Sequence, residues 1–276
     1  MVAAFAGWND AASAATTALG AIAATLDAEP VAEIDPEEFY DFQVTRPRIK
    51  LAEGETREVE WPTNSILAAA APGAERDLVL VSGIEPNMRW RTFASAVTEA
   101  AAHLDVEMVV TLGALLADVP HTRQVPITGF ASDPELVENL SLSRSTYEGP
   151  TGIVGIVHDA CRRRGMTSAS LWAAVPHYIA AVPNPKAALA LLRRLEGFTG
   201  IAIEAGELEE AMERFDTQVD RAVASNPEIE ELVRRLETEQ DEEPELEADE
   251  VPSGDSIARD FQRFLRQRDP GQPGGG

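Results

Sequence analysis

A stretch in the middle of the chain, residues 153–195, reads as a helix, a buried strand and a second helix. The first part carries apolar residues at helical spacing, namely Ile153, Ile156, Val157, Ala160 and Cys161. Residues 169–175 form a continuous apolar run, which is typical of a parallel strand buried on both faces. Asn184-Pro185 then begins another helix, with Asn as the N-cap and Pro in the first turn. A strand of this kind needs helices on both sides, so the stretch predicts an α/β fold.

The preceding part of the chain repeats this alternation of strands and helices. Apolar runs predict strands at 2–5, 31–34, 65–70, 78–82, 106–112 and 125–129. Amphipathic or small-residue segments predict helices at 11–26, 90–104 and 133–140. Alternating polarity around a Glu-Gly-Glu turn predicts a β-hairpin over residues 48–61. The pattern predicts a three-layer α/β/α sandwich over residues 1–205, with a mostly parallel sheet.

Three further segments follow this domain. Residues 206–236 predict a helical hairpin extension that docks on the α/β body, and a contact between copies of the chain is the alternative. Residues 237–252 predict an acidic, solvated linker. Residues 253–276 predict a short helix and a flexible tail. Phe261 and Phe264 lie on one face of that helix and are candidates for binding a partner.

Composition excludes several classes of function. The formal net charge of −24 argues against a nucleic-acid or membrane partner, and residues 207–252 alone hold 18 acidic and 4 basic residues. No apolar run is long enough to span a bilayer, and the N-terminus lacks the basic region of a signal peptide. The single cysteine, Cys161, excludes an internal disulfide and is expected to be a buried thiol. We therefore expect a cytoplasmic protein.

Polar side chains follow four of the predicted strands. These clusters are Asn9 and Asp10; Glu85, Asn87 and Arg89; Asp118, His121 and Arg123; and His177 and Tyr178. If the strands are parallel, all four clusters lie at the carboxyl edge of the sheet, where open α/β sheets bind ligands. The alternative is that these residues only cap helices, form ion pairs or satisfy loops.

Within these clusters, two kinds of role are open. Asp118, His121 and Asp10 are the catalytic candidates, because a carboxylate near a histidine suits general acid–base chemistry. The ligand-binding candidates are Asn9, Glu85, Arg89, Arg123, His177 and Tyr178. Established motifs for serine nucleophiles, zinc and nucleotide phosphates do not occur, so we expect no metal and no cofactor. The glycines at 149, 152 and 155 permit a phosphate-loop interpretation, but packing of a helix against the sheet is the favoured one.

Several motifs resemble one known family. The sequences are FAGWNDAASAAT, DPEEFYDFQVTRP, SGIEPNMRWRTF, GP-x-G-I-x-G, SLWAAVPHYIA and PNPKAAL, all within residues 1–200. Together they resemble the PAC2 family, the proteasome assembly chaperone 2-like proteins, in its actinobacterial branch. The resemblance implies a phosphorylase/hydrolase-like α/β/α fold. Eukaryotic members are chaperones that bind proteasome subunits, and some relatives have been labelled ATP-grasp-like or carboxylate–amine ligases.

The leading hypothesis is therefore a non-enzymatic protein-binding or assembly protein that forms homo-oligomers, possibly trimers. The alternative is a small-molecule binder or enzyme, ATP-grasp-like or phosphorylase/hydrolase-like, that uses a cleft at the carboxyl edge of the sheet.

Overall fold

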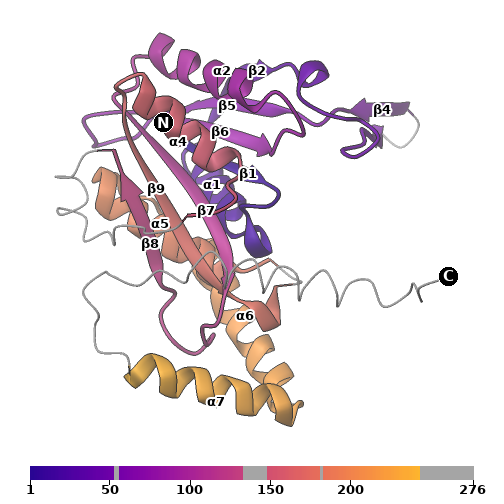
Figure 1. The fold of residues 1–276 in the computed structure, drawn as a ribbon, viewed down its shortest axis with the longest axis vertical. Coiled ribbons are helices and arrows are strands. Elements are labelled where there is room, and N and C mark those ends of the chain that lie inside the picture. The colour runs from indigo at the N-terminus through magenta and orange to yellow at the C-terminus, as the bar shows by residue number, and fades with distance from the viewer. Residues whose placement is uncertain (53–55, 133–147, 181–182, 243–276) are drawn as a thin grey trace.

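The computed structural model describes residues 1–52, 56–132, 148–180 and 183–242. A seven-stranded sheet with the order β2-β5-β6-β1-β7-β9-β8 lies at the centre of the described chain (Figure 1). Its strands are β1 (Val2–Ala6), β2 (Glu29–Ile34), β5 (Asn64–Ala69), β6 (Leu78–Ile84), β7 (Met108–Ala117), β8 (Ile127–Ala131) and β9 (Thr167–Pro176). Strands β6, β1, β7 and β9 are parallel neighbours, whereas β5 and β8 run in the opposite direction. Four adjacent strands therefore end at the same edge.

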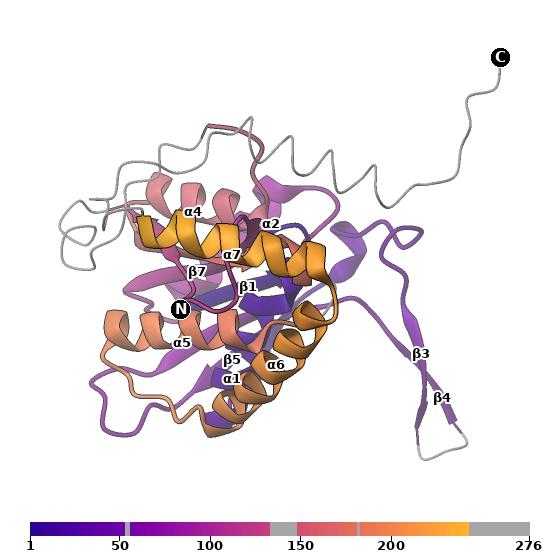
Figure 2. The same cartoon turned by 90° about the horizontal axis from the view of Figure 1, so that it is seen from below.

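Helices cover both faces of this sheet (Figure 2). On one face lie α1 (Ala14–Thr25) and α5 (Pro185–Thr199), which share a core with the sheet. On the other face lie α2 (Trp90–His103) and α4 (Ile153–Arg163), whose core includes Phe93 and Val157. The three-layer α/β/α architecture expected from the alternation of elements is confirmed.

The extension after the sheet domain consists of α6 (Gly206–Ala224) and α7 (Pro227–Glu242). Helix α6 packs on α5, and α7 lies across the ends of β7 and β9 (Figures 1 and 2). A small apolar cluster joins the two helices through Phe215, Val219, Val223 and Val233. Helix α7 continues through Glu242, so residues 237–242, which we expected to begin the acidic linker, are helical. The rest of that linker and the segment with Phe261 and Phe264 lie outside the described residues.

Strand β7 is longer than the sequence suggested. The apolar run predicted a strand that ends at Leu112, but the strand continues through Gly113 to Ala117. Gly113 pairs with Trp172 on β9, and a Cβ at residue 113 would lie 2.7 Å from the indole ring. The glycine therefore makes room for a neighbouring ring inside a strand. The short helix expected at 133–140 lies outside the described residues.

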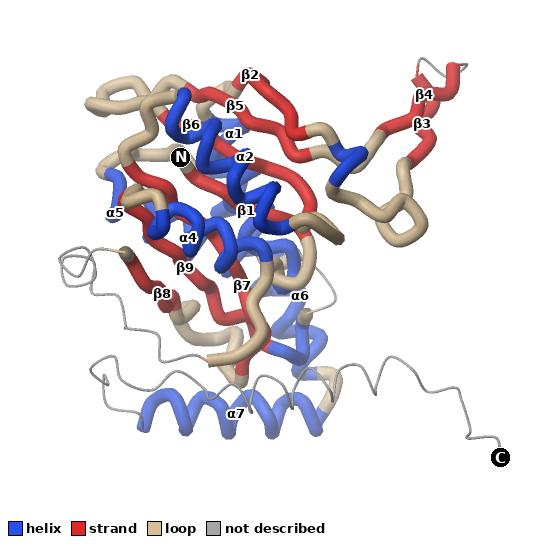
Figure 3. Tube along the Cα trace, turned by 45° about the horizontal axis from the view of Figure 1, so that its top comes forward, coloured by secondary structure: helices blue, strands red, loops and turns tan. Residues whose placement is uncertain are grey.

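The expected β-hairpin forms a separate two-stranded ribbon, β3 (Arg48–Ala52) and β4 (Thr56–Glu60). Figure 3 shows that it projects away from the layered body. We call this ribbon the arm.

Cys161 lies inside the core on α4, as expected of a structural thiol. Burial raises its pKa to about 11. Among the described helices, none is both long and apolar enough to cross a membrane.

Candidate functional site

The topology of the sheet predicts one crevice at its carboxyl edge. Strands β1 and β6 are neighbours, but α1, which follows β1, and α2, which follows β6, cover opposite faces. Ligands of open α/β sheets bind where the helices diverge in this way. Asn9 and Asp10 follow β1, and Glu85 follows β6, so these predicted site residues do come to the crevice.

Glu85 fills this crevice with its own carboxylate. Its Oε1 accepts hydrogen bonds from Nδ2 of Asn9 at 3.1 Å and from the backbone N–H of Ile153 at 2.8 Å. Its Oε2 accepts from the backbone N–H of Trp8 at 3.3 Å. Ile153 begins α4, where the helix dipole stabilises an anion. The position that a ligand phosphate would occupy is therefore held by a side chain of the protein.

Gly152, the residue before α4, lies against Asn9 and Glu85 in the same crevice. A Cβ at this residue would lie 1.9 Å from Nδ2 of Asn9 and 2.5 Å from Oε1 of Glu85. Only a residue without a side chain lets the start of α4 approach the strand ends this closely. Gly152 thus serves the close packing that the favoured interpretation predicted, whereas a Cβ at residue 155 would meet only Thr151 of the preceding turn.

Tyr40 and Asn64 extend this closed region, and sequence reasoning missed both. The Tyr40 hydroxyl donates to the carbonyl of Ile84 at 2.5 Å and accepts from the side-chain amide of Asn64. Burial raises the pKa of Tyr40 to about 12. Nearby, Oδ1 of Asn87 accepts from the backbone N–H of Asp41 at 3.0 Å. The sequence did contain a signal for this region, because Tyr40 and Asp41 lie inside the DPEEFYDFQVTRP motif that contributes to the family resemblance.

Two other predicted residues of this edge have structural contacts. Asp10 is buried. Its carboxylate accepts hydrogen bonds from the backbone N–H groups of Ala15, at 2.8 Å, and Thr16, at 3.2 Å. The Thr16 hydroxyl donates to the same carboxylate. Burial raises its pKa, and these donors oppose the shift. Arg89 pairs with Glu38 at 2.6 Å and not with Glu85 of its own cluster.

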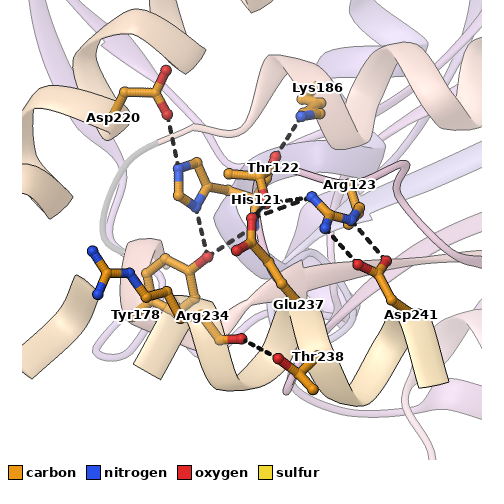
Figure 4. A network of polar contacts seen from close by, with 10 residues as sticks. All are labelled: His121, Thr122, Arg123, Tyr178, Lys186, Asp220, Arg234, Glu237, Thr238 and Asp241. Atoms are coloured by element: carbon orange, nitrogen blue, oxygen red, sulfur yellow. Dashed lines mark hydrogen bonds and ion pairs between the residues drawn. The ribbon is translucent and has the colours of Figure 1, made fainter. Parts of the chain in front are cut away.

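A second group of polar residues lies beyond the crevice, because β7 and β9 extend past the end of β1. Its centre is His121, whose side chain is buried (Figure 4). The backbone N–H of His121 donates to the Tyr178 hydroxyl at 2.8 Å, and Nδ1 lies 2.8 Å from the same oxygen. Nε2 lies 3.1 Å from Oδ1 of Asp220 on α6. We infer that the Tyr178 hydroxyl donates a hydrogen bond to Nδ1 of His121, so that the imidazole carries its hydrogen on Nε2 and donates it to Asp220.

The Tyr178 phenol is held in its neutral form. Burial raises its pKa to about 12, and the negative charge of Glu237 acts in the same direction. A phenol with a raised pKa is a poor nucleophile or base near neutral pH. The Tyr178–His121–Asp220 chain joins α6 to the strand ends, and its phenol is not activated.

Arg123 fastens α7 to the same loop. Its Nε and Nη2 donate to the two carboxylate oxygens of Asp241 at 2.9 and 2.6 Å, and Nη1 donates to Glu237 at 3.2 Å. Thr122 also donates to Glu237, at 2.5 Å. The sequence assigned both acidic residues to a linker, although their spacing of four residues is that of one helix face.

Lys186 on α5 completes the network. Its ammonium group lies 3.2 Å from Asp216 on α6 and donates to the carbonyl of His121. Asp118 lies away from His121 and pairs instead with His177, at 2.9 Å between Oδ1 and Nδ1, with both side chains substantially exposed. The predicted candidates thus do not form one site. Asn9 and Glu85 close the crevice, Asp118 and His177 form an exposed pair, and His121, Arg123 and Tyr178 hold the α6–α7 extension.

The space inside the network is too small for an organic ligand. A cavity lined by His121, Arg123, Lys186 and Phe215 has a volume of about 10 Å³. Such a volume holds a single water molecule, whereas small-molecule sites have roughly 300–1,000 Å³.

The comparisons with known proteins agree with the fold. The model of the PAC2 family matches residues 4–223. The chain belongs to the PAC2 family. Its structure is similar to that of a PAC2 family protein from Streptomyces avermitilis, with 49% identity and a TM-score of 0.79 over 84% of this chain and 98% of the other.

Two further structures have a similar fold. A Mycobacterium tuberculosis protein described as a proteasome-assembly chaperone homologue is 45% identical, with a TM-score of 0.78 over 84% of this chain and 98% of that one. An archaeal proteasome activator from Pyrococcus furiosus shares the fold at 16% identity, with a TM-score of 0.66 over 80% and 91% of the two chains. The comparison with curated proteins returned no match.

Proposed function

We propose that this PAC2 protein is a non-enzymatic, chaperone-like assembly protein that binds proteasome subunits and forms homo-oligomers in the cytoplasm. The observation that carries the proposal is the closed crevice at the carboxyl edge. Glu85, Asn9 and the start of α4 occupy the position where an enzyme of this topology would hold its ligand. The name of the Mycobacterium relative supports proteasome subunits as the client.

The same edge carries apolar side chains that a protein partner can cover. Trp8 is 44% exposed after β1, and Met88 is 42% exposed after β6. Of the nine exposed large apolar residues in the described chain, seven lie in the loops of this edge or on the arm, namely Trp8, Val44, Ile49, Leu51, Val59, Trp61 and Met88. Gathering of exposed apolar side chains in one region is typical of protein-binding surfaces. We therefore assign client binding to the edge around Trp8 and Met88.

The charge of the molecule supports the same class of partner. A net charge of −24 disfavours nucleic acids and favours proteins with cationic surfaces. It also keeps an assembly protein soluble while it exposes apolar side chains.

A test is co-expression of the chain with proteasome subunits of its own organism, followed by affinity purification and native mass spectrometry. The double variant Trp8→Ala/Met88→Ala should reduce recovery of the subunits at least about tenfold, because it removes two apolar contacts. Leu104→Ala is the matched control, because Leu104 is also 42% exposed but follows α2, away from the carboxyl ends of the strands. The control should retain the subunits.

Two results would contradict the proposal. One is undiminished recovery of the subunits with the double variant. The other is a bound small molecule that leaves the protein on collisional activation, which would favour the enzyme or carrier alternative.

A further inference from the structure

Helix α7 has the pattern of a helix that binds in a groove. Val233 and Leu236 on its inner face are buried, and Ile229 is half-buried. Spacings of four and three residues place these side chains on one face of the helix. Amphipathic helices with this spacing are a common form in which one protein segment binds the groove of another. The family match ends at residue 223, so α7 follows the domain that the family model describes.

The surface beneath α7 combines apolar side chains with a cation, and we call it the seat. Its apolar part joins α6 to the residues after β9, and Val233 and Ile229 of α7 pack there. The side chains of the seat are Tyr178, Ile179, Phe215, Val219, Val223 and Arg123. Figure 4 shows that Glu237 and Asp241 of α7 point toward Arg123. The seat therefore has an apolar floor and a cationic end.

Arg123 binds two carboxylates that lie one helical turn apart. Its Nε and Nη2 donate to both oxygens of Asp241, and its Nη1 donates to Glu237 at 3.2 Å. A guanidinium that binds a carboxylate through two parallel hydrogen bonds is selective for geometry as well as for charge. The seat therefore fits a helix with apolar residues at positions i, i+4 and i+7 and carboxylates at i+8 and i+12, as α7 has from Ile229 onward.

The contacts at the cationic end are of a kind that a competing helix can replace. The side chains of Arg123 and Asp241 are 36% and 56% exposed. Exposed ion pairs contribute little to stability, because water solvates both partners once they separate. Since α7 is the last helix of the described chain, its release displaces no later described element. The domain can therefore stay folded while the seat is vacated.

The seat lies beside the edge to which we assign client binding. Strand β1 lies between β6 and β7 in the sheet, and Asp10, two residues after Trp8, forms a bridge with Ala114 on β7. Helix α7 lies across the ends of β7 and β9 (Figure 2). A client that contacts Trp8 thus presents its neighbouring segments to the seat at high effective concentration, as the tether to α6 does for α7. The two helices therefore compete on similar terms.

We propose that α7 is an exchangeable occupant of the seat, and that an acidic amphipathic helix of the client takes its place. This inference rests on the proposed function and names the part of the client that is recognised. Charge complementarity favours an acidic helix, because within the described chain both ion pairs of Arg123 are made with α7. Once α7 leaves, a helix with the same spacing of carboxylates restores them.

The test uses a fluorescein-labelled peptide of residues 226–242 as the probe and the full chain as the receptor. Glu237→Gln/Asp241→Asn weakens the hold of the chain's own α7, so this opened variant should bind the peptide at least about tenfold more tightly than the wild type in fluorescence anisotropy. Glu231→Gln/Glu239→Gln is the matched control, because Glu231 is exposed and Glu239 pairs with Arg235 inside α7. The control should bind the peptide as the wild type does.

A second peptide tests the contact with Arg123. The peptide that carries Glu237→Gln/Asp241→Asn should bind the opened variant at least about tenfold more weakly than the unchanged peptide. Addition of Arg123→Ala to the opened variant should make the two peptides bind equally. Equal thermal midpoints for all variants would show that the domain remains folded. Failure of the opened variant to bind the unchanged peptide at up to about 1 mM, or equal binding of both peptides while Arg123 is present, would overturn the exchange.

The client is tested by co-expression with proteasome subunits. The opened variant should recover at least about threefold more subunits than the Glu231→Gln/Glu239→Gln control, because its seat is free for the client. Equal or lower recovery would overturn the client helix as the occupant and leave the proposed function intact. Absence of subunits with the wild type and with both variants would instead overturn the proposed function, and with it the client as the occupant, whatever the peptides do.

Discussion

The Glu85 crevice and the His121 network both lie where parallel strands end, yet they are held together differently. In the crevice, the half-buried carboxylate of Glu85 accepts hydrogen bonds from backbone N–H groups, and Gly152 lets α4 approach the strand ends. In the network, side chains of opposite charge connect segments about 100 residues apart, and several are exposed, including Asp220 and Asp241. The Glu85 crevice is therefore closed by packing, whereas ion pairs that water can replace help to hold α7 at the His121 network.

This difference predicts which part of the molecule is able to separate from the rest. Packing contacts are lost only with the core, whereas exposed ion pairs contribute little to global stability. We expect α7 to open first, while α6, which packs on α5 through Leu208, and the crevice stay closed.

The largest effect is expected at Gly152. Gly152→Ala places a Cβ against Asn9 and Glu85 and should lower the free energy of unfolding by about 2–3 kcal/mol. Gly20→Ala in α1 is the matched control, because nothing lies within 4 Å of its Cβ, and it should stabilise the protein by up to about 1 kcal/mol. Urea denaturation measures both. A Gly152→Ala protein as stable as wild type would show that the crevice has room for an added group.

An intermediate effect is expected above pH 10 and compares the two regions directly. Burial raises the pKa of Tyr40, beside the crevice, and of Tyr178, in the network, from 10 to about 12. The unfolded phenols lose their protons first, so stability is intact below pH 10 and falls as the pH rises to about 12. Tyr40→Phe and Tyr178→Phe should each make the fall of the unfolding free energy with pH shallower. An unchanged slope in Tyr178→Phe would indicate that its phenol is solvated.

The smallest global effect is expected at Arg123. Arg123→Ala should change global stability little, because Arg123 lies at the surface and its partners are the half-buried Glu237 and the exposed Asp241. Hydrogen exchange in residues 227–242 should nevertheless accelerate strongly, and 0.5 M salt should do the same to the wild type. Arg234→Ala is the control, because Arg234 pairs with Glu230 within α7 itself. Equal exchange in the two variants would contradict the fastening role of Arg123.

The architecture was predictable because its signals are local. The apolar run at 169–175, the Asn184-Pro185 start of α5 and the hairpin at 48–61 are each determined by neighbouring residues, and all three were confirmed. The N-cap is seen directly, since Oδ1 of Asn184 accepts from the backbone N–H of Ala187. Errors arose where a distant residue decides the outcome, as when the Trp172 ring makes Gly113 part of a strand.

The site was only partly predictable for the same reason. Parallel topology brought all four polar clusters to one edge, as expected, but it did not indicate how far each strand extends. Because β7 and β9 pass the end of β1, Asp118 and His121 lie apart from Asn9 and Glu85. The partners of Arg123 come from α7, more than 100 residues later in the chain. No local pattern around residue 123 contains that information.

The burial of Cys161 makes the protein a convenient subject for spectroscopy. It is the single cysteine of the chain, and with a pKa of about 11 it forms little of the thiolate that reacts with maleimides. A cysteine introduced at an exposed position such as Val44 would therefore carry a dye or spin label alone, with no need to remove the native thiol. Distances between labelled copies, and between the arm and the α6–α7 extension, can then be followed in solution on an otherwise unaltered sequence.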